Sequence, residues 1–272
     1  MIIKHTQGCT NKFRSGNICF WLIYIVKFVV GLKKPIGDAD GMTLFRQGSG
    51  TRRQRHERTQ KRVQNAYNCR LRTLRICIFG KHHMSTANEN VDDDAIVAAT
   101  RRWVDRAVIG LNLCPFAKAV QVKEQVRYVV AHARTPESLL DTLMDELQRL
   151  ADTDPEEVDT TLLIHPHVLQ DFLDFNEFLD VADAAVEDMS LDGELQIASF
   201  HPDYQFADTD PNDISNFTNR APYPILQLLR EDSIDRAVEA IPEAADIFEK
   251  NIDTLEQLGH EGWDKLDVGP AR

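Results

Sequence analysis

The sequence that follows Met84 predicts an α/β fold: a small sheet of about four strands, mostly parallel or mixed, with helices packed on it. Two observations predict this class. Short runs of β-branched and apolar residues alternate with longer runs whose apolar residues recur at helical spacing. The connections between successive strands are also long enough to be helices, so most strands are expected to pair in parallel through right-handed crossovers.

Five helices are expected, over 94–111, 135–150, 171–189, 232–238 and 244–258. Thr135 offers a capping hydroxyl directly before Pro136, and proline is favoured at the first helical position. Gly259 is expected to close the last helix, because glycine adopts the left-handed conformation at which many helices end.

Four strands are expected, over 126–132, 160–165, 195–201 and 224–230. The segment 160–165 is short and almost continuously apolar, which is typical of a strand buried on both faces. The segment 224–230 fits a strand or a helix equally well. A stretch of about 20 residues without periodicity, 202–223, precedes it, and loops of that length in compact domains are commonly functional or disordered.

Charge divides the chain into two parts. Residues 1–83 hold 17 Lys and Arg against three Asp and Glu, so the remainder holds 31 − 17 = 14 basic and 43 − 3 = 40 acidic residues. We therefore expect a basic N-terminal segment, 1–83, and a single acidic α/β domain, 84–272. Binding of the acidic part to a nucleic-acid backbone is not expected, because both would be negatively charged.

Residues 1–83 allow three interpretations. The apolar run 18–32 is shorter than a membrane span, is interrupted by Lys27 and precedes no cleavage site, so no membrane segment is expected. The basic run 52–62 offers cations for phosphates but lacks interleaved aromatic residues. The favoured interpretation is a non-globular segment, disordered or translated from upstream of a true start at Met84.

Only one cysteine, Cys114, follows Met84, so that part of the chain has no internal disulfide. This composition fits a reducing compartment, and we expect a cytoplasmic location.

Three segments of unusual composition carry a resemblance to a known family: Gly-Leu-Asn-Leu-Cys-Pro-Phe-Ala (110–117), Phe-His-Pro-Asp-Tyr-Gln-Phe (200–206) and Asn-Arg-Ala-Pro-Tyr-Pro-Ile-Leu-Gln-Leu-Leu-Arg-Glu (219–231). The sequence resembles a bacterial family that is catalogued among the domains of unknown function as family 1415, over roughly 95–240. The resemblance implies no activity, cofactor or catalytic residue. At Gln227 the family pattern tends to carry His, so an acid–base role is not expected there.

Two His-Pro pairs, at His165 and His201, follow two of the expected strands. Ligands of α/β sheets collect at the carboxyl ends of parallel strands, where loops bring side chains together. His165, His167 and His201 with Asp203 and Asp208 or Asp210 would suit a divalent metal such as Zn²⁺, and a metal-bound water would serve hydrolysis. The plainer interpretation is that each histidine hydrogen-bonds a carbonyl or caps a turn. The leading hypothesis is a small-molecule enzyme at these strand ends.

Two alternatives remain. Cys114 as a nucleophile would make a thiol-dependent enzyme, although its apolar neighbours favour a buried thiol of ordinary or raised pKa. Arg220 would serve either enzyme as a clamp for a carboxylate or phosphate, or form a surface ion pair. The other alternative is a non-catalytic protein-binding domain. Its loop 202–223 has four aromatic residues that either anchor an interface or pin the loop to its own core.

Overall fold

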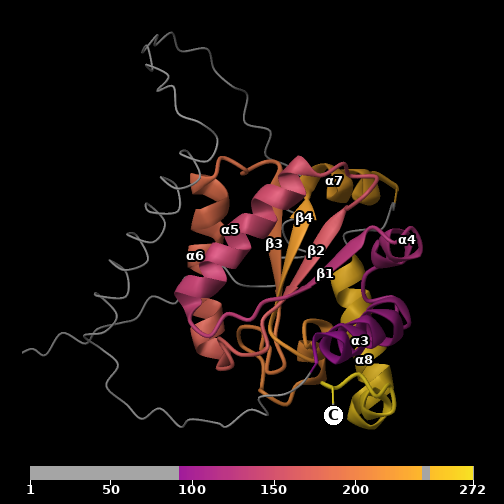
Figure 1. Ribbon diagram of the computed structural model, residues 1–272. Helices are drawn as coiled ribbons and strands as arrows, with labels where there is room; N and C mark the ends of the chain where they lie inside the picture. Colours follow the sequence, from indigo (N-terminus) through magenta and orange to yellow (C-terminus); the bar gives the residue numbers. More distant parts are fainter. Residues whose placement is uncertain (1–91, 241–245, 272) are drawn as a thin grey trace, which may run out of the picture.

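The computed structural model describes residues 92–240 and 246–271, which contain a four-stranded mixed sheet with helices on both faces (Figure 1). In spatial order the strands are β1 (Val126–Val130), β2 (Thr160–Ile164), β4 (Ile225–Arg230) and β3 (Leu195–Phe200). β1 and β2 pair in parallel, whereas β4 runs antiparallel to both β2 and β3. The α/β class and the mixed sheet are confirmed, and the ambiguous segment 224–230 forms a strand. The expectation that most strands pair in parallel is wrong: of the three strand pairings in the described ranges, one is parallel, because β4 inserts between β2 and β3 in the opposite direction.

Inserting β4 between β2 and β3 decides which strand ends meet. Ile225, at the start of β4, lies opposite both Ile164, the last residue of β2, and Phe200, the last residue of β3. β2 and β3 therefore run in the same direction although they are not neighbours. The chain after each of them, at His165 and His201, leaves the sheet at the same edge.

The helices are α3 (Asp93–Trp103), α4 (Ala117–Val122), α5 (Pro136–Asp152), α6 (Phe172–Asp188), α7 (Glu231–Ala240) and α8 (Ile247–Asp264). A π-helical segment, η1 (Val104–Ile109), continues α3, and a 3₁₀ segment, η2 (Ile214–Thr218), lies in the long loop. The Thr135 side chain accepts from the Ser138 backbone N–H and caps α5 as expected. At Gly259 the backbone is non-helical, at φ 61° and ψ 173°, so the helical run that begins at Ile247 is interrupted there as expected; a second helical stretch, not predicted, continues α8 to Asp264.

Two apolar cores form because successive side chains of a strand point to opposite faces of the sheet. On one face Leu163 of β2 packs with Leu143 of α5 and Phe175 of α6. On the other face Leu162 packs in a second cluster with Trp103 of α3 and Leu255 of α8. Figure 1 shows α5 and α6 together across one face, with α3 and α8 grouped on the other side.

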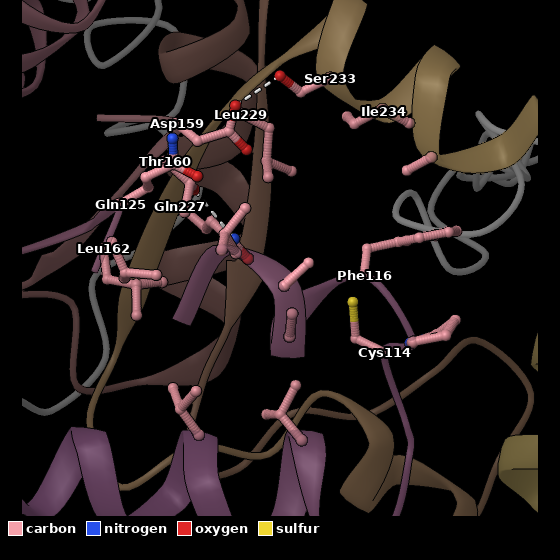
Figure 2. A pocket seen from close by; sticks show the side chains of 18 of the residues that line it. Cys114, Phe116, Gln125, Asp159, Thr160, Leu162, Gln227, Leu229, Ser233 and Ile234 are labelled. Carbon is pink, nitrogen blue, oxygen red and sulfur yellow. Dashed lines mark hydrogen bonds between the residues drawn. The ribbon is translucent and has the colours of Figure 1, made fainter. Parts of the chain in front are cut away.

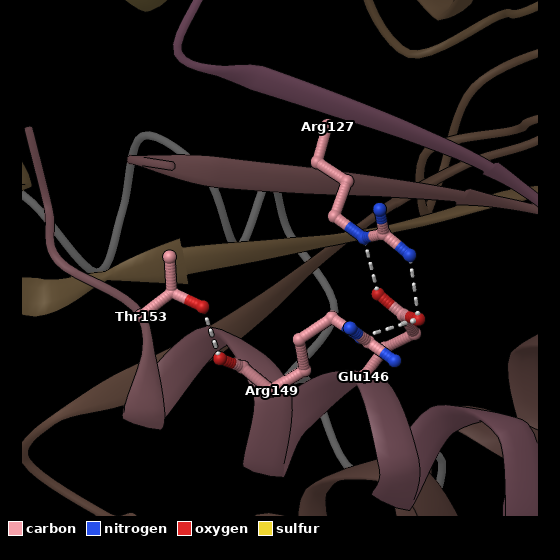
Figure 3. Close-up of polar contacts among 4 residues, drawn as sticks. All are labelled: Arg127, Glu146, Arg149 and Thr153. Atoms are coloured by element: carbon pink, nitrogen blue, oxygen red, sulfur yellow. Dashed lines mark hydrogen bonds and ion pairs between the residues drawn. The ribbon is translucent and has the colours of Figure 1, made fainter. Parts of the chain in front are cut away.

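A buried carboxylate ties β1 to α5. The Glu146 side chain is 8% exposed and accepts hydrogen bonds from Nε and Nη2 of Arg127 at 2.8 and 3.1 Å. Arg149, one turn along α5, places its Nε 3.4 Å from the same carboxylate (Figure 3). Two guanidinium groups thus compensate the charge of one carboxylate beneath the edge strand.

Several expectations fall outside the residues that the structure describes. These are the basic segment 1–83, the proposed start at Met84 and the first residues of the helix expected from 244. Among the helices of the described ranges, none is both long enough and apolar enough to cross a membrane.

Candidate functional site

A pocket of about 470 Å³ lies over the sheet face that carries Leu162; we call it the sheet-face pocket (Figure 2). Its floor consists of side chains from all four strands of the sheet: Val126 of β1, Leu162 of β2, Leu229 of β4 and Phe200 of β3 are among them. Its walls come from the end of α3, η1, the segment 113–120, α7 and α8. Elements far apart in the sequence therefore enclose one space above a rigid floor.

Most of the pocket wall is apolar, and polar side chains gather at one end, which we call the polar end. The polar end comprises Gln125, Asp159, Thr160, Gln227 and Ser233. Figure 2 shows these five residues grouped on one side of the pocket, with Cys114 and Phe116 on the other. Gln125 directly precedes β1, and Asp159 directly precedes β2, so the polar end lies at the starting edge of these parallel strands.

Hydrogen bonds hold the polar end in place. The Thr160 hydroxyl donates to the Leu228 carbonyl at 2.7 Å and accepts from Nε2 of Gln227 at 3.1 Å. The Ser233 hydroxyl donates to Oδ1 of Asp159 at 2.5 Å, which joins α7 to the start of β2. The side chains that face the pocket are therefore positioned before any ligand arrives.

Nε2 of Gln125 donates to the carbonyls of Pro155 and Glu156 at 3.2 and 2.9 Å. The Gln125 carbonyl in turn accepts from the Asp159 backbone N–H at 2.9 Å. These bonds fix the chain just before β2 against the chain just before β1.

Cys114, a predicted nucleophile, lines the sheet-face pocket. Burial raises the pKa of its thiol to about 12, and hydrogen bonds from the backbone of Phe116 and Ala117 offset only part of that effect. The sulfur is therefore a protonated thiol at neutral pH, and the thiolate is the nucleophilic form of cysteine. Cys114 is therefore a buried wall residue and not an activated nucleophile.

The structure brings His165 and His201 together at the opposite edge of the sheet. The ring of Phe175 lies 5.6 Å from the His165 ring and 5.1 Å from the His201 ring, measured between centroids. Phe172 also packs against His201, at 5.5 Å. Both histidines are fully buried under these aromatic rings, and neither lines the sheet-face pocket.

Backbone groups fix the protonation of both rings. Nδ1 of His165 lies 3.0 Å from the Val168 carbonyl, which accepts only, so Nδ1 carries the proton. In His201 the Asp203 backbone N–H donates to Nδ1 at 3.0 Å, and Nε2 therefore donates to the Leu169 carbonyl at 3.2 Å. Burial lowers the pKa of His165 to about 4 and also lowers the pKa of His201.

Nε2 of His165 is a buried acceptor without a hydrogen-bond partner among the described residues. The other predicted metal ligands do not complete a set around it: His167 is half-buried, and Asp203 and Asp208 are exposed on the loop. Within 92–240 and 246–271, no three His, Cys, Asp or Glu side chains form a group able to hold a metal ion.

Arg220, the predicted anion clamp, holds the long loop. Its Nη2 donates to the Pro211 carbonyl at 2.6 Å and its Nε to the Tyr204 carbonyl at 3.3 Å. Its guanidinium carbon also lies 4.4 Å from the centroid of the Phe217 ring. These contacts assign the guanidinium to the internal structure of the loop.

The aromatic residues of the loop point inward. Tyr204 and Phe206 are each 7% exposed and form a small core with Val238 and Ile247. Phe217 packs edge-on against Trp263 of α8 at 5.0 Å. The sequence allowed these aromatic residues either to anchor an interface or to hold the loop against its own core. In the structure they hold the loop against its own core.

The polar end was not predicted from the sequence, because the predicted site lay at the carboxyl ends of the strands. Two signals were present. Gln227 is the one amide within the apolar run of β4, and Gln125 and Asp159 precede two neighbouring parallel strands. Neither signal identifies a pocket until the helices that wall it are placed.

Comparison with protein families matches residues 95–265 to the family described as "Protein of unknown function (DUF1415)", which covers more than half of the chain. The chain belongs to this family. The resemblance predicted from three motifs is confirmed, and in this DUF1415 chain all three motifs contribute to the sheet-face pocket, through Cys114, Phe200 and Gln227. No curated protein and no solved structure matches the chain.

Proposed function

We propose that this DUF1415 chain binds a small, largely apolar molecule in the sheet-face pocket. The observation that carries the proposal is the pocket itself: about 470 Å³, with apolar walls and a compact polar end. Binding sites for small molecules are typically clefts of roughly 300–1,000 Å³ with a few placed polar groups that orient the ligand. Burial of the apolar part of the ligand would drive binding, and the polar end would set its orientation.

The hydrogen bonds within the polar end support a preorganised site. Thr160 and Gln227 come from two strands of the sheet, while Ser233 joins from α7. Groups held by such bonds lose little freedom when a ligand binds, so a larger share of the contact energy appears as affinity.

The protonated state of Cys114 supports ligand binding rather than nucleophilic chemistry in this pocket. Its raised thiol pKa keeps the sulfur protonated, and among the described residues that line the pocket there is no histidine to remove the proton. The thiol-dependent enzyme and the metal-assisted hydrolase at His165 and His201 stay predictions. The inward packing of Tyr204 and Phe206 weighs against an interface built from the loop aromatics.

The test fills the pocket with a side chain. Ala117 lines the pocket, whereas its neighbour Lys118 is exposed and does not, so Ala117→Trp and Lys118→Trp add the same indole in two environments. The probe is N-phenyl-1-naphthylamine, a small neutral dye whose fluorescence rises in apolar surroundings, titrated into the full-length chain. We expect Ala117→Trp to weaken binding at least about tenfold, and Lys118→Trp to bind like the unaltered chain.

Thermal unfolding of the variants checks that each remains folded. The proposal is rejected when the unaltered chain does not bind the dye, or when the two folded variants bind it equally well.

A further inference from the structure

We propose that the natural ligand of the sheet-face pocket is an apolar primary amine, bound with its ammonium group at the polar end. This inference rests on the proposed function and names the chemical class of its ligand. It follows from the direction of every hydrogen bond at the polar end. Those directions leave acceptor atoms facing the ligand.

The orientation of the Gln227 amide follows from Thr160. The Thr160 hydroxyl has one proton, and the Leu228 carbonyl 2.7 Å away accepts it, because a carbonyl cannot donate. The Gln227 atom 3.1 Å from that hydroxyl must then be the amide nitrogen. The Gln227 amide oxygen receives no hydrogen bond from the described residues.

The same reasoning fixes Gln125. Its Nε2 lies within hydrogen-bond distance of two backbone carbonyls, at 2.9 and 3.2 Å, so this atom must be the nitrogen. The Gln125 side chain is 5% exposed, and its amide oxygen accepts no hydrogen bond from the described residues. Since this oxygen is not one of the fully buried unpartnered atoms, it retains some accessible surface. Because Gln125 lines the pocket, we assign the remaining accessibility of that oxygen to the pocket.

Two more lining amides repeat the pattern. Asn219 donates to the Ser199 carbonyl at 3.2 Å, and Asn251 donates to the Leu113 carbonyl at 2.9 Å. Each of the four carboxamides around the pocket therefore donates an N–H group to an acceptor within the protein, which leaves the amide oxygens of Gln125 and Gln227 as acceptors.

Asp159 supplies the charge. The Ser233 hydroxyl donates to one of its oxygens, and a carboxylate has room for several more hydrogen bonds. Asp159 is half-buried in the pocket lining, next to Gln125, whose carbonyl accepts its backbone N–H. Hydrogen bonds between an ammonium and a carboxylate are roughly twice as strong as those between neutral groups.

The cations that line the pocket do not offset this acceptor surface. Arg230 is buried and donates to the carbonyls of Leu150, Thr153 and Val158. Lys123 and Arg236 are exposed, so water screens their charges, and Arg236 donates to the Ser233 hydroxyl.

Net charge acts in the same direction. Residues 84–272 hold 14 Lys and Arg against 40 Asp and Glu, from 31 − 17 and 43 − 3. A surface of that sign raises the local concentration of small cations and repels small anions. Long-range attraction and the local acceptors at the polar end therefore favour the same ligand class.

The test compares three probes of one chain length with the full-length protein by isothermal titration calorimetry: hexylamine, 1-hexanol and hexanoate at neutral pH. We expect hexylamine to bind at least about tenfold more tightly than 1-hexanol, and hexanoate to bind weakest. Asp159→Asn should reduce hexylamine affinity about tenfold and should reduce 1-hexanol affinity much less, because only the amine loses a charge partner. Asp188→Asn, the same charge change on the exposed side of α6 outside the pocket, should have no effect.

Binding of hexylamine should also fall in Ala117→Trp, which assigns the amine to the pocket and not to the acidic surface. Gln227→Met, which keeps the length of the side chain and removes its amide oxygen, should weaken hexylamine more than 1-hexanol. Hexanoate or 1-hexanol binding as tightly as hexylamine, or hexylamine affinity unchanged in Asp159→Asn, would overturn the amine assignment while leaving a small-molecule pocket. Failure of all three probes together with the naphthylamine dye would remove the proposed function itself.

Discussion

The Cys114 thiol should react slowly at neutral pH. Its reaction rate should still be rising at pH values well above those at which an ordinary cysteine is fully ionised. The perturbation is a change of pH in the presence of a small neutral disulfide, 4,4′-dithiodipyridine. Only the thiolate attacks a disulfide, so the rate follows the ionised fraction of the thiol. The burial that raises the pKa of Cys114 thus controls a measurable reaction.

The magnitude follows from the shift. A thiol pKa of about 12 in place of 9.0 lowers the thiolate fraction about a thousandfold at pH values below both. A more basic thiolate is intrinsically more nucleophilic, with a Brønsted coefficient of roughly 0.4–0.5, which recovers about 15-fold to 30-fold. The net expectation is a rate about 30-fold to 60-fold below that of a thiol with an unshifted pKa.

The assay is peptide mass spectrometry of the full-length chain, quenched at intervals, with glutathione in the same tube as the reference thiol. Mass distinguishes the peptide that contains Cys114 from those of the other four cysteines in the sequence. Cys114→Ser provides the blank. Labelling as fast as glutathione, with a rate that levels off near neutral pH, would refute the burial argument and support the thiol-dependent enzyme.

Three further outcomes are expected. The difference in unfolding free energy between the unaltered chain and His165→Asn should narrow by up to about 3 kcal/mol as the pH falls from 6.5 toward about 4, because the histidine binds a proton in the unfolded chain and not in the folded one. Urea unfolding at several pH values measures this difference, and a difference that stays constant with pH would contradict the prediction. Glu146→Gln should lower the free energy of unfolding by about 1–3 kcal/mol, because it removes the charge that pairs with Arg127. Glu261→Gln, which changes an exposed ion pair, should lower it by under about 0.5 kcal/mol. Equal losses for the two variants in denaturant titrations would show that burial of the Arg127–Glu146 pair adds no stability. If the strand-end hydrolase is correct, elemental analysis of the purified full-length chain should find stoichiometric metal that His201→Ala loses, and metal-free protein in both would end that hypothesis.

Local sequence patterns predicted the elements well where the pattern was long. The stripe of α5 and the cap at Thr135 follow from spacing and side-chain chemistry within one helix, and both are confirmed. The sequence predicted the interruption at Gly259 but not the helical stretch after it, which carries Trp263 against Phe217 of the distant loop. Contacts of that kind have no signature in a window of ten residues.

The candidate site divides in the same way. Apolar neighbours of Cys114 predicted a buried thiol, and the raised pKa agrees with that interpretation. The sequence also placed histidines directly after two strands, and the structure brings His165 and His201 together. It did not predict that aromatic rings of α6 would cover them, because the position of α6 depends on packing across the sheet.

The sequence by itself determined the α/β class, the apolar faces and the family, since these depend on residue types at short and regular separations. Only the tertiary structure decided that β4 lies between β2 and β3, and that chain from α3 to α8 encloses one pocket. The amide of Gln227 shows the reason. Its orientation depends on a hydroxyl 67 residues away, at Thr160, and that contact forms only when the whole sheet minimises its exposed apolar surface and pairs its polar groups.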